Sequence, residues 1–229
     1  MRITLRYAIA FSILCLLLQE LHELAHLLAD RQTINCGTRY FLFWQSCEQG
    51  NHYAEAIIAL AGPFMNFILM VTGFILLSKR STPVQKSIGI SLILACIPLQ
   101  RLQALVFRGS DEITGFRQLM QPSEPFKGAA VVAGVSLMLL FIIPSLYRAF
   151  INIKTKGSWL VMLGFLVIPF IVNYVLQQLL AGGQTRAMLI ASPGSFLPSR
   201  LVLLDILLLI LFLPFAKSIG QLFSFKTSS

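Results

Sequence analysis

YAIAFSILCLLLQELHELAHLL (residues 7–28) is the stretch that decides the fold class of this chain. Its first half is an unbroken apolar run, and a helix that crosses a lipid bilayer needs about 20 such residues. Its second half carries HELAH (residues 22–26), two histidines and a glutamate near the end of the same expected helix. Ionisable residues are costly inside a membrane span, so they indicate a functional site there.

The whole chain has the composition of a membrane protein. Of its 229 residues, 56% are hydrophobic and only 12% are charged, whereas soluble domains carry about 25% charged residues. The net charge of +9 does not indicate nucleic-acid binding, because no basic cluster with interleaved aromatic residues is present. We assign it to loop lysines and arginines at the membrane surface. The lipid bilayer is therefore an expected partner, and nucleic acid is not.

Apolar runs of spanning length recur along the chain and predict an all-α, polytopic membrane protein with about six transmembrane helices. No domain-type linker, repeat or low-complexity tract separates them, so residues 1–229 are expected to form a single integral-membrane domain. The expected spans are residues 5–29, 54–78, 87–107, 128–150, 157–180 and 201–221.

The connection between the first two expected spans has a different composition. Within residues 31–53, TRYFLFW (38–44) is rich in β-branched and aromatic residues, and the NCG before it is typical of a turn. We expect a short strand or β-hairpin here, with an aromatic loop at the membrane interface as the alternative. An open sheet edge cannot face lipid, so a hairpin must pack on protein or lie at the interface.

An even number of spans places both termini on one face of the membrane. That face collects more lysines and arginines than the other, so the positive-inside rule predicts cytoplasmic termini. Cys36 and Cys47 lie together on the opposite face. A disulfide between them would need an oxidising compartment there, and two free loop cysteines are the alternative.

HELAH has the H-E-x-x-H arrangement of zinc hydrolases. Residues four apart share a helix face, so His22 and His26 can offer two imidazole nitrogens to one metal ion, with Glu23 beside them. Zinc acidifies the water that it binds, and Glu23 would take the proton as general base. The pattern predicts one Zn²⁺ per chain, with His22 and His26 as ligands and Glu23 as the catalytic residue. A polar helix end among lipid headgroups is the alternative.

A catalytic zinc needs a third protein ligand. The remaining histidine, His52, lies in a loop, and acidic residues are few. GSDEITGF (109–116) is the most suggestive segment, because it follows the third expected span on the same membrane face as HELAH. Ser110 or Asp111 could instead cap the turn after it.

HELAH, ALAGPFMNF (59–67) and GSDE (109–112) together resemble the site-2 protease family of intramembrane zinc metalloproteases. In that family an HExxH helix is followed by a Gly-Pro-x-x-Asn element, matched here by Gly62, Pro63 and Asn66. The resemblance implies that these three residues position the substrate. It also implies a membrane-associated β element after HELAH, whose edge could hold an unwound substrate segment.

Family members take their third ligand from an aspartate after an Asn-Leu-x-Pro stretch, typically as Asp-Gly. Asp111 is the best match in this chain, and Glu112 is the alternative third ligand. Two departures separate the sequence from the pattern. LACIPLQ (94–100) replaces the Asn-Leu part, and Glu112 stands where the family has glycine.

The resemblance covers about residues 15–120 and implies a metalloprotease-like core over about residues 5–120, with additional helices over 128–221. The implied activity is that of an intramembrane zinc endopeptidase, which hydrolyses peptide bonds in or near transmembrane segments of membrane-anchored proteins. A proteolytically inactive relative that acts as a membrane-protein-binding or metal-binding scaffold is the first alternative. A small transporter or channel is the second. Nothing in the sequence indicates an oligomeric state.

Overall fold

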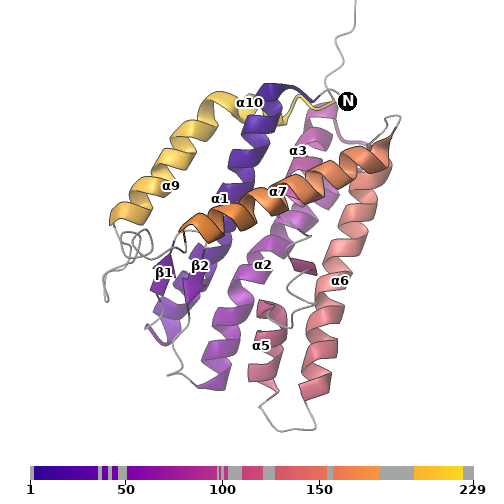
Figure 1. Cartoon of the computed structure of the whole chain (residues 1–229). Coiled ribbons are helices and arrows are strands. Elements are labelled where there is room, and N and C mark those ends of the chain that lie inside the picture. Colours follow the sequence, from indigo (N-terminus) through magenta and orange to yellow (C-terminus); the bar gives the residue numbers. More distant parts are fainter. Residues whose placement is uncertain are drawn as a thin grey trace, which may run out of the picture.

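In a computed structural model the chain forms a bundle of helices with one small β-hairpin (Figure 1). The structure describes residues 3–35, 38–40, 43–45, 51–96, 98, 101–102, 110–120, 127–153, 157–180 and 199–223. In chain order the elements are α1 (Leu5–Thr33), β1 (Thr38–Tyr40), β2 (Phe43–Gln45), α2 (His52–Leu76), α3 (Pro83–Ala95), α5 (Asp111–Leu119), α6 (Lys127–Asn152), α7 (Ser158–Leu180), α9 (Ser199–Phe212), the short 3₁₀ helix η2 (Leu213–Phe215) and α10 (Ala216–Ile219).

Five helices within the described residues are long and apolar enough to cross a membrane, which confirms an all-α polytopic membrane protein. They are Leu5–Thr33, His52–Leu76, Gly128–Asn152, Ser158–Val175 and Val202–Ile219.

The expected third span, residues 87–107, is wrong as a single spanning helix. In its place α3 has 13 residues, which gives a length of about 20 Å against a bilayer core of about 30 Å. The helix ends at Ala95, shortly before Pro98. Proline lacks the backbone N–H that a helix needs and disfavours helical backbone in the residue before it.

The two ends of the described chain lie at one end of the bundle (Figure 1). α10 contacts α1, and the backbone N–H of Phe223 donates to Ser87 Oγ on α3 at 3.0 Å. Both described ends therefore lie at the same end of the helix bundle, and the prediction that both termini share one membrane face stays a prediction. The prediction that this face is cytoplasmic remains a prediction.

The segment after α1 forms the expected hairpin. α1 ends where the N–H groups of Ile34 and Asn35 both donate to the carbonyl of Asp30. Asn35 then adopts a positive φ of 59°, a conformation that asparagine tolerates better than most residues. β1 and β2 pair antiparallel, with Arg39 opposite Trp44. Both strands contact α1, so the hairpin packs on protein, as an open sheet edge near lipid must.

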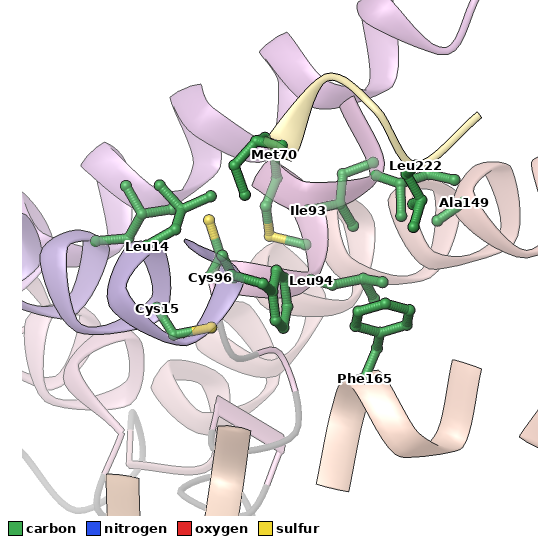
Figure 2. Close-up of a cluster of buried hydrophobic side chains, with 14 of the residues drawn as sticks. Leu14, Cys15, Met70, Ile93, Leu94, Cys96, Ala149, Phe165 and Leu222 are labelled. Carbon is green, nitrogen blue, oxygen red and sulfur yellow. The ribbon is translucent and has the colours of Figure 1, made fainter. Parts of the chain in front are cut away.

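The apolar core of the bundle surrounds the N-terminal half of α1 (Figure 2). Leu14 and Cys15 of α1 lie in a cluster with Met70 of α2, Leu94 of α3 and Phe165 of α7. The cluster contains no residue of HELAH. The C-terminal half of α1 buries polar side chains instead: Gln19, Glu20, His22, Glu23, His26 and Asp30. The N-terminal half of α1 thus belongs to the apolar core, and its C-terminal half forms a buried polar centre.

The short helix α5 lies between α2 and α6 (Figure 1). Two glycines permit this close packing. A Cβ on Gly115 would lie 2.5 Å from the Leu60 side chain, and a Cβ on Gly134 would lie 2.9 Å from the Ile113 backbone nitrogen. Small residues at helix contacts let backbones approach closely. The packing fixes how α5 is rotated, and therefore which of its side chains face α1.

Candidate metal centre

His22, Glu23 and His26 lie on one buried part of α1. His22 is 2% exposed and His26 is 3% exposed. Their rings are 4.7 Å apart between centroids and nearly perpendicular, as the four-residue spacing on a helix predicts. The two Nε2 atoms are 3.1 Å apart. Two imidazole nitrogens therefore lie close enough to share one metal ion.

Asp111 brings a third ligand-type atom to this position from α5. Its Oδ2 lies 3.3 Å from His22 Nε2 and 3.6 Å from His26 Nε2. Tetrahedral zinc with bonds of about 2.0–2.2 Å separates its ligand atoms by about 3.3–3.6 Å. The three spacings of 3.1, 3.3 and 3.6 Å are close to this value. Among the described residues, His22, His26 and Asp111 form the group able to hold a metal ion.

The second ring nitrogen of His26 fixes its tautomer. Nδ1 lies 2.7 Å from the carbonyl oxygen of Ile58 on α2, and a carbonyl can only accept, so Nδ1 carries the hydrogen. In the neutral imidazole, Nε2 then keeps its lone pair, which can face the site. Metal-binding histidines in proteins use such an outer hydrogen bond for the same purpose.

Gly62 of α2 forms the opposing wall. A Cβ at this position would lie 2.3 Å from His26 Nε2 and 2.4 Å from His22 Cε1, distances that no real Cβ contact reaches. Only glycine allows the α2 backbone to approach the two rings this closely. This close approach is the role of Gly62 in the structure. Pro63, its neighbour, instead lines an apolar groove of about 430 Å³ between α2 and α6.

Asp111 is the first residue of α5, and Ser110 before it is the N-cap. The Ser110 hydroxyl accepts the backbone N–H of Ile113 at 3.3 Å, so the capping role falls to the serine and the Asp111 carboxylate faces the histidines. Burial opposes ionisation of this carboxyl. Arg101 Nη1 donates to Asp111 Oδ2 at 3.0 Å, and its positive charge favours the carboxylate, so the pKa of Asp111 lies well below its usual range.

Replacing Ser110 by alanine is expected to lower the free energy of unfolding by about 1 kcal/mol, because α5 loses its N-cap. Zinc stoichiometry should stay unchanged, since the serine is not one of the three proposed ligands. Thermal unfolding in detergent would measure the first effect and elemental analysis the second. Ser136→Ala is the matched control, because Ser136 is exposed within α6. An equal loss of stability in both variants would contradict the capping role.

Glu23 is held from one turn earlier on α1. The side-chain amide of Gln19 donates to Glu23 Oε1 at 2.6 Å, and both side chains are buried. The contact orients the carboxylate and leaves its second oxygen available. Gln19 was not among the predicted site residues, although it lies at the four-residue spacing that places it beside Glu23.

Arg101 is the second residue that the sequence patterns did not single out. Its Nη2 donates to His22 Nε2 at 2.8 Å and its Nη1 donates to Asp111 Oδ2 at 3.0 Å. The available signal was a charged residue inside an expected apolar span, 87–107, since such residues mark functional sites by default.

The other predicted residues lie around this centre. Glu112 is fully buried but does not belong to the convergent group, so Asp111 rather than its neighbour faces the histidines. Asn66 is buried one turn after Gly62 on α2, and its backbone carbonyl lies 3.9 Å from Cys96 Sγ. His52 begins α2 and pairs with Gln118 of α5 through Nδ1 at 2.9 Å. The proposed disulfide between Cys36 and Cys47 lies outside the described residues.

No protein-family model, curated protein or solved structure matches this chain. The resemblance to site-2 proteases therefore rests on the three short motifs alone. The membrane-protein fold and the His-His-Asp cluster rest on the structure itself.

Proposed function

We propose that the chain is an intramembrane zinc metalloendopeptidase, which hydrolyses peptide bonds in or near the transmembrane segments of membrane-anchored proteins. The observation that carries the proposal is the convergence of three ligand-type atoms from His22, His26 and Asp111, at separations of 3.1–3.6 Å. Two imidazoles and one carboxylate are a ligand set typical of catalytic zinc, which keeps a fourth coordination position open.

The surroundings of these atoms also suit zinc. In the neutral form of His26, Nε2 is the nitrogen free to bind a metal ion, because Nδ1 donates to the Ile58 carbonyl. Asp111 is held as a carboxylate by its polar neighbours. Gly62 leaves the histidine rings room on the α2 side. Bound there, zinc would supply a Lewis acid that polarises a carbonyl group and acidifies a water molecule.

Glu23 is the residue suited to move protons in this reaction. It lies next to His22 in sequence, is buried, and is oriented through Oε1 by Gln19. Its free oxygen would accept a proton from the attacking water and later deliver it to the leaving amine. The hydrogen bond from Gln19 leaves this oxygen in a defined direction, which general-base catalysis requires.

The depth of the site indicates the class of substrate. HELAH belongs to α1, one of the five helices able to span a membrane. A peptide bond that reaches it must belong to a chain that is itself in the membrane. Such a chain is helical and hides its carbonyls in internal hydrogen bonds, so it must unwind locally before cleavage. The hairpin β1–β2, which contacts α1, offers backbone groups to which an extended segment could add.

The test uses the full-length chain in lipid nanodiscs. We expect about one zinc per chain by elemental analysis, and cleavage of at least one member of a panel of single-span reporters. Chelation should stop the cleavage and added zinc should restore it. Asp111→Ala is expected to weaken zinc binding by at least about a hundredfold, whereas Glu112→Gln, the matched neighbour, should retain zinc.

Three results would contradict parts of this proposal. A wild-type chain without zinc would exclude a zinc enzyme. Zinc retained in Asp111→Ala but lost in Glu112→Gln would move the third ligand to Glu112. Zinc binding without cleavage of any reporter would remove the peptidase activity and leave a metal-binding protein.

One observation favours the alternative of a proteolytically inactive relative that binds membrane proteins. The Arg101 guanidinium already neutralises Asp111 and satisfies His22 Nε2, so the cluster is electrostatically stable without a metal ion. This alternative predicts stable association with a membrane partner, no turnover, and no effect of chelators or of Glu23→Gln on the complex.

A further inference from the structure

Arg101 contacts two of the three atoms that a metal ion would need as ligands. Its guanidinium bridges His22 Nε2, at 2.8 Å, and Asp111 Oδ2, at 3.0 Å, and both acceptors belong to the proposed ligand set. The side chain is only 15% exposed, so most of it is enclosed by the protein. The planar fork of arginine suits the bridging of two acceptors, which a lysine ammonium does less well.

A cation is needed at this position whether or not metal is bound. The Nε2 atoms of His22 and His26 and Oδ2 of Asp111 lie within 3.6 Å of one another. Electron-pair donors this close repel one another unless a positive group lies between them. Arg101 supplies that charge in the structure, and it keeps the ligand atoms in place.

The two acceptors of Arg101 differ in whether they can bind the arginine and a metal ion at the same time. A neutral imidazole nitrogen has one lone pair, so His22 Nε2 can accept from Arg101 or bind a metal ion, but not both. A carboxylate oxygen has two lone pairs, so Asp111 Oδ2 can serve both partners. Guanidinium and metal therefore exclude each other at His22, while Asp111 can keep hold of the arginine.

We propose that Arg101 is an internal competitor of the metal ion and sets the metal affinity of the centre. When a divalent cation binds, Nη2 leaves His22 and the guanidinium stays attached to Asp111 through Nη1. When the cation leaves, Arg101 returns and closes the site. The inference rests on the proposed function only in taking His22, His26 and Asp111 as the metal site. Beyond the proposed function, the inference identifies Arg101 as the residue that lowers the affinity of the site for a metal ion.

The test measures the zinc dissociation constant of the full-length chain in nanodiscs, by competition with a chelator of known affinity at fixed pH. Arg101→Gln removes the competing cation and is expected to bind zinc at least about tenfold more tightly, since zinc no longer has to break a charge-assisted hydrogen bond at His22. Arg101→Lys should be intermediate, because an ammonium keeps the charge but cannot bridge the two acceptors. Arg117→Gln is the matched control, an exposed arginine on α5, and should bind zinc as the wild type does.

Two outcomes overturn the competition. One is an Arg101→Gln chain that binds zinc no more tightly than the wild type. The other is an Arg101→Lys chain with wild-type affinity beside a tighter Arg101→Gln chain, which would assign the effect to charge repulsion alone. The lysine variant keeps the charge, so it provides a second measurement if the glutamine variant fails to fold.

The same titrations separate this inference from the proposed function. One zinc in the wild type with unchanged affinity in Arg101→Gln would overturn the competitor and leave the zinc enzyme. No zinc in the wild type but one zinc in Arg101→Gln would support the competitor and contradict the zinc enzyme. No zinc in either chain would overturn both.

Discussion

Replacing Glu23 by glutamine is expected to slow cleavage of a membrane reporter by at least about a hundredfold, while zinc content stays unchanged. The reason is chemical. A positioned general base contributes about 10²–10⁴ to such a rate, and an amide cannot accept the proton. Glutamine keeps the size of the side chain, and its Oε1 can still accept from Gln19, which lies 2.6 Å from Glu23 Oε1. The ligand helix should therefore be undisturbed.

The measurement pairs initial cleavage rates with elemental analysis of the same preparation. Glu55→Gln is the control, the same chemical change in the first turn of α2, and it should cleave at the wild-type rate. Undiminished cleavage by the Glu23→Gln chain would exclude Glu23 as the base. Joint loss of zinc and cleavage would show instead that the residue supports the metal site.

The second large effect is expected from Gly62→Ala. The new Cβ would lie 2.3 Å from His26 Nε2 and 2.4 Å from His22 Cε1, so the rings or the two helices must move apart. Overpacking of this kind costs about 1–3 kcal/mol. A displacement of even 1 Å takes the ligand atoms out of tetrahedral spacing, so we expect zinc affinity to fall by at least about a hundredfold.

Two other glycines provide matched controls. A Cβ on Gly164 of α7 would come no nearer than 4.0 Å to any neighbour, and a Cβ on Gly128 of α6 would meet nothing within 4 Å. Alanine at either position should retain zinc and leave the melting temperature unchanged or slightly higher, because alanine is the better helix former. Wild-type zinc affinity in Gly62→Ala would show that α2 does not confine the histidines.

The membrane character of the chain and the two histidines of the candidate metal centre could be predicted from local patterns. The apolar runs have the length of spanning helices, and five of the described helices carry them. The four-residue spacing of His22 and His26 places both rings on one face wherever the helix lies. The prediction of a span over 87–107 failed because α3 ends at Ala95, inside an apolar run that hydropathy treats as continuous.

The remaining parts of the site depend on contacts between distant segments. Gly62 could be read locally as part of a kink beside Pro63, and only the packing of α2 on α1 shows that its missing Cβ makes room for the rings. Arg101 is a charged residue inside the expected span 87–107, but its contact with His22 spans 79 positions in sequence. Neither position has a spacing rule that would have revealed its partner.

The sequence by itself determined that this is a helical membrane protein with two imidazoles and a carboxylate on one turn of its first helix, because hydropathy and the helical repeat are local properties. Only the tertiary structure decided between Asp111 and Glu112. Adjacent residues on a helix point about 100° apart, so the choice depends on the rotation of α5. That rotation is set by Gly115 against α2 and by Gly134 against the α5 backbone, contacts that exist only once the bundle has formed.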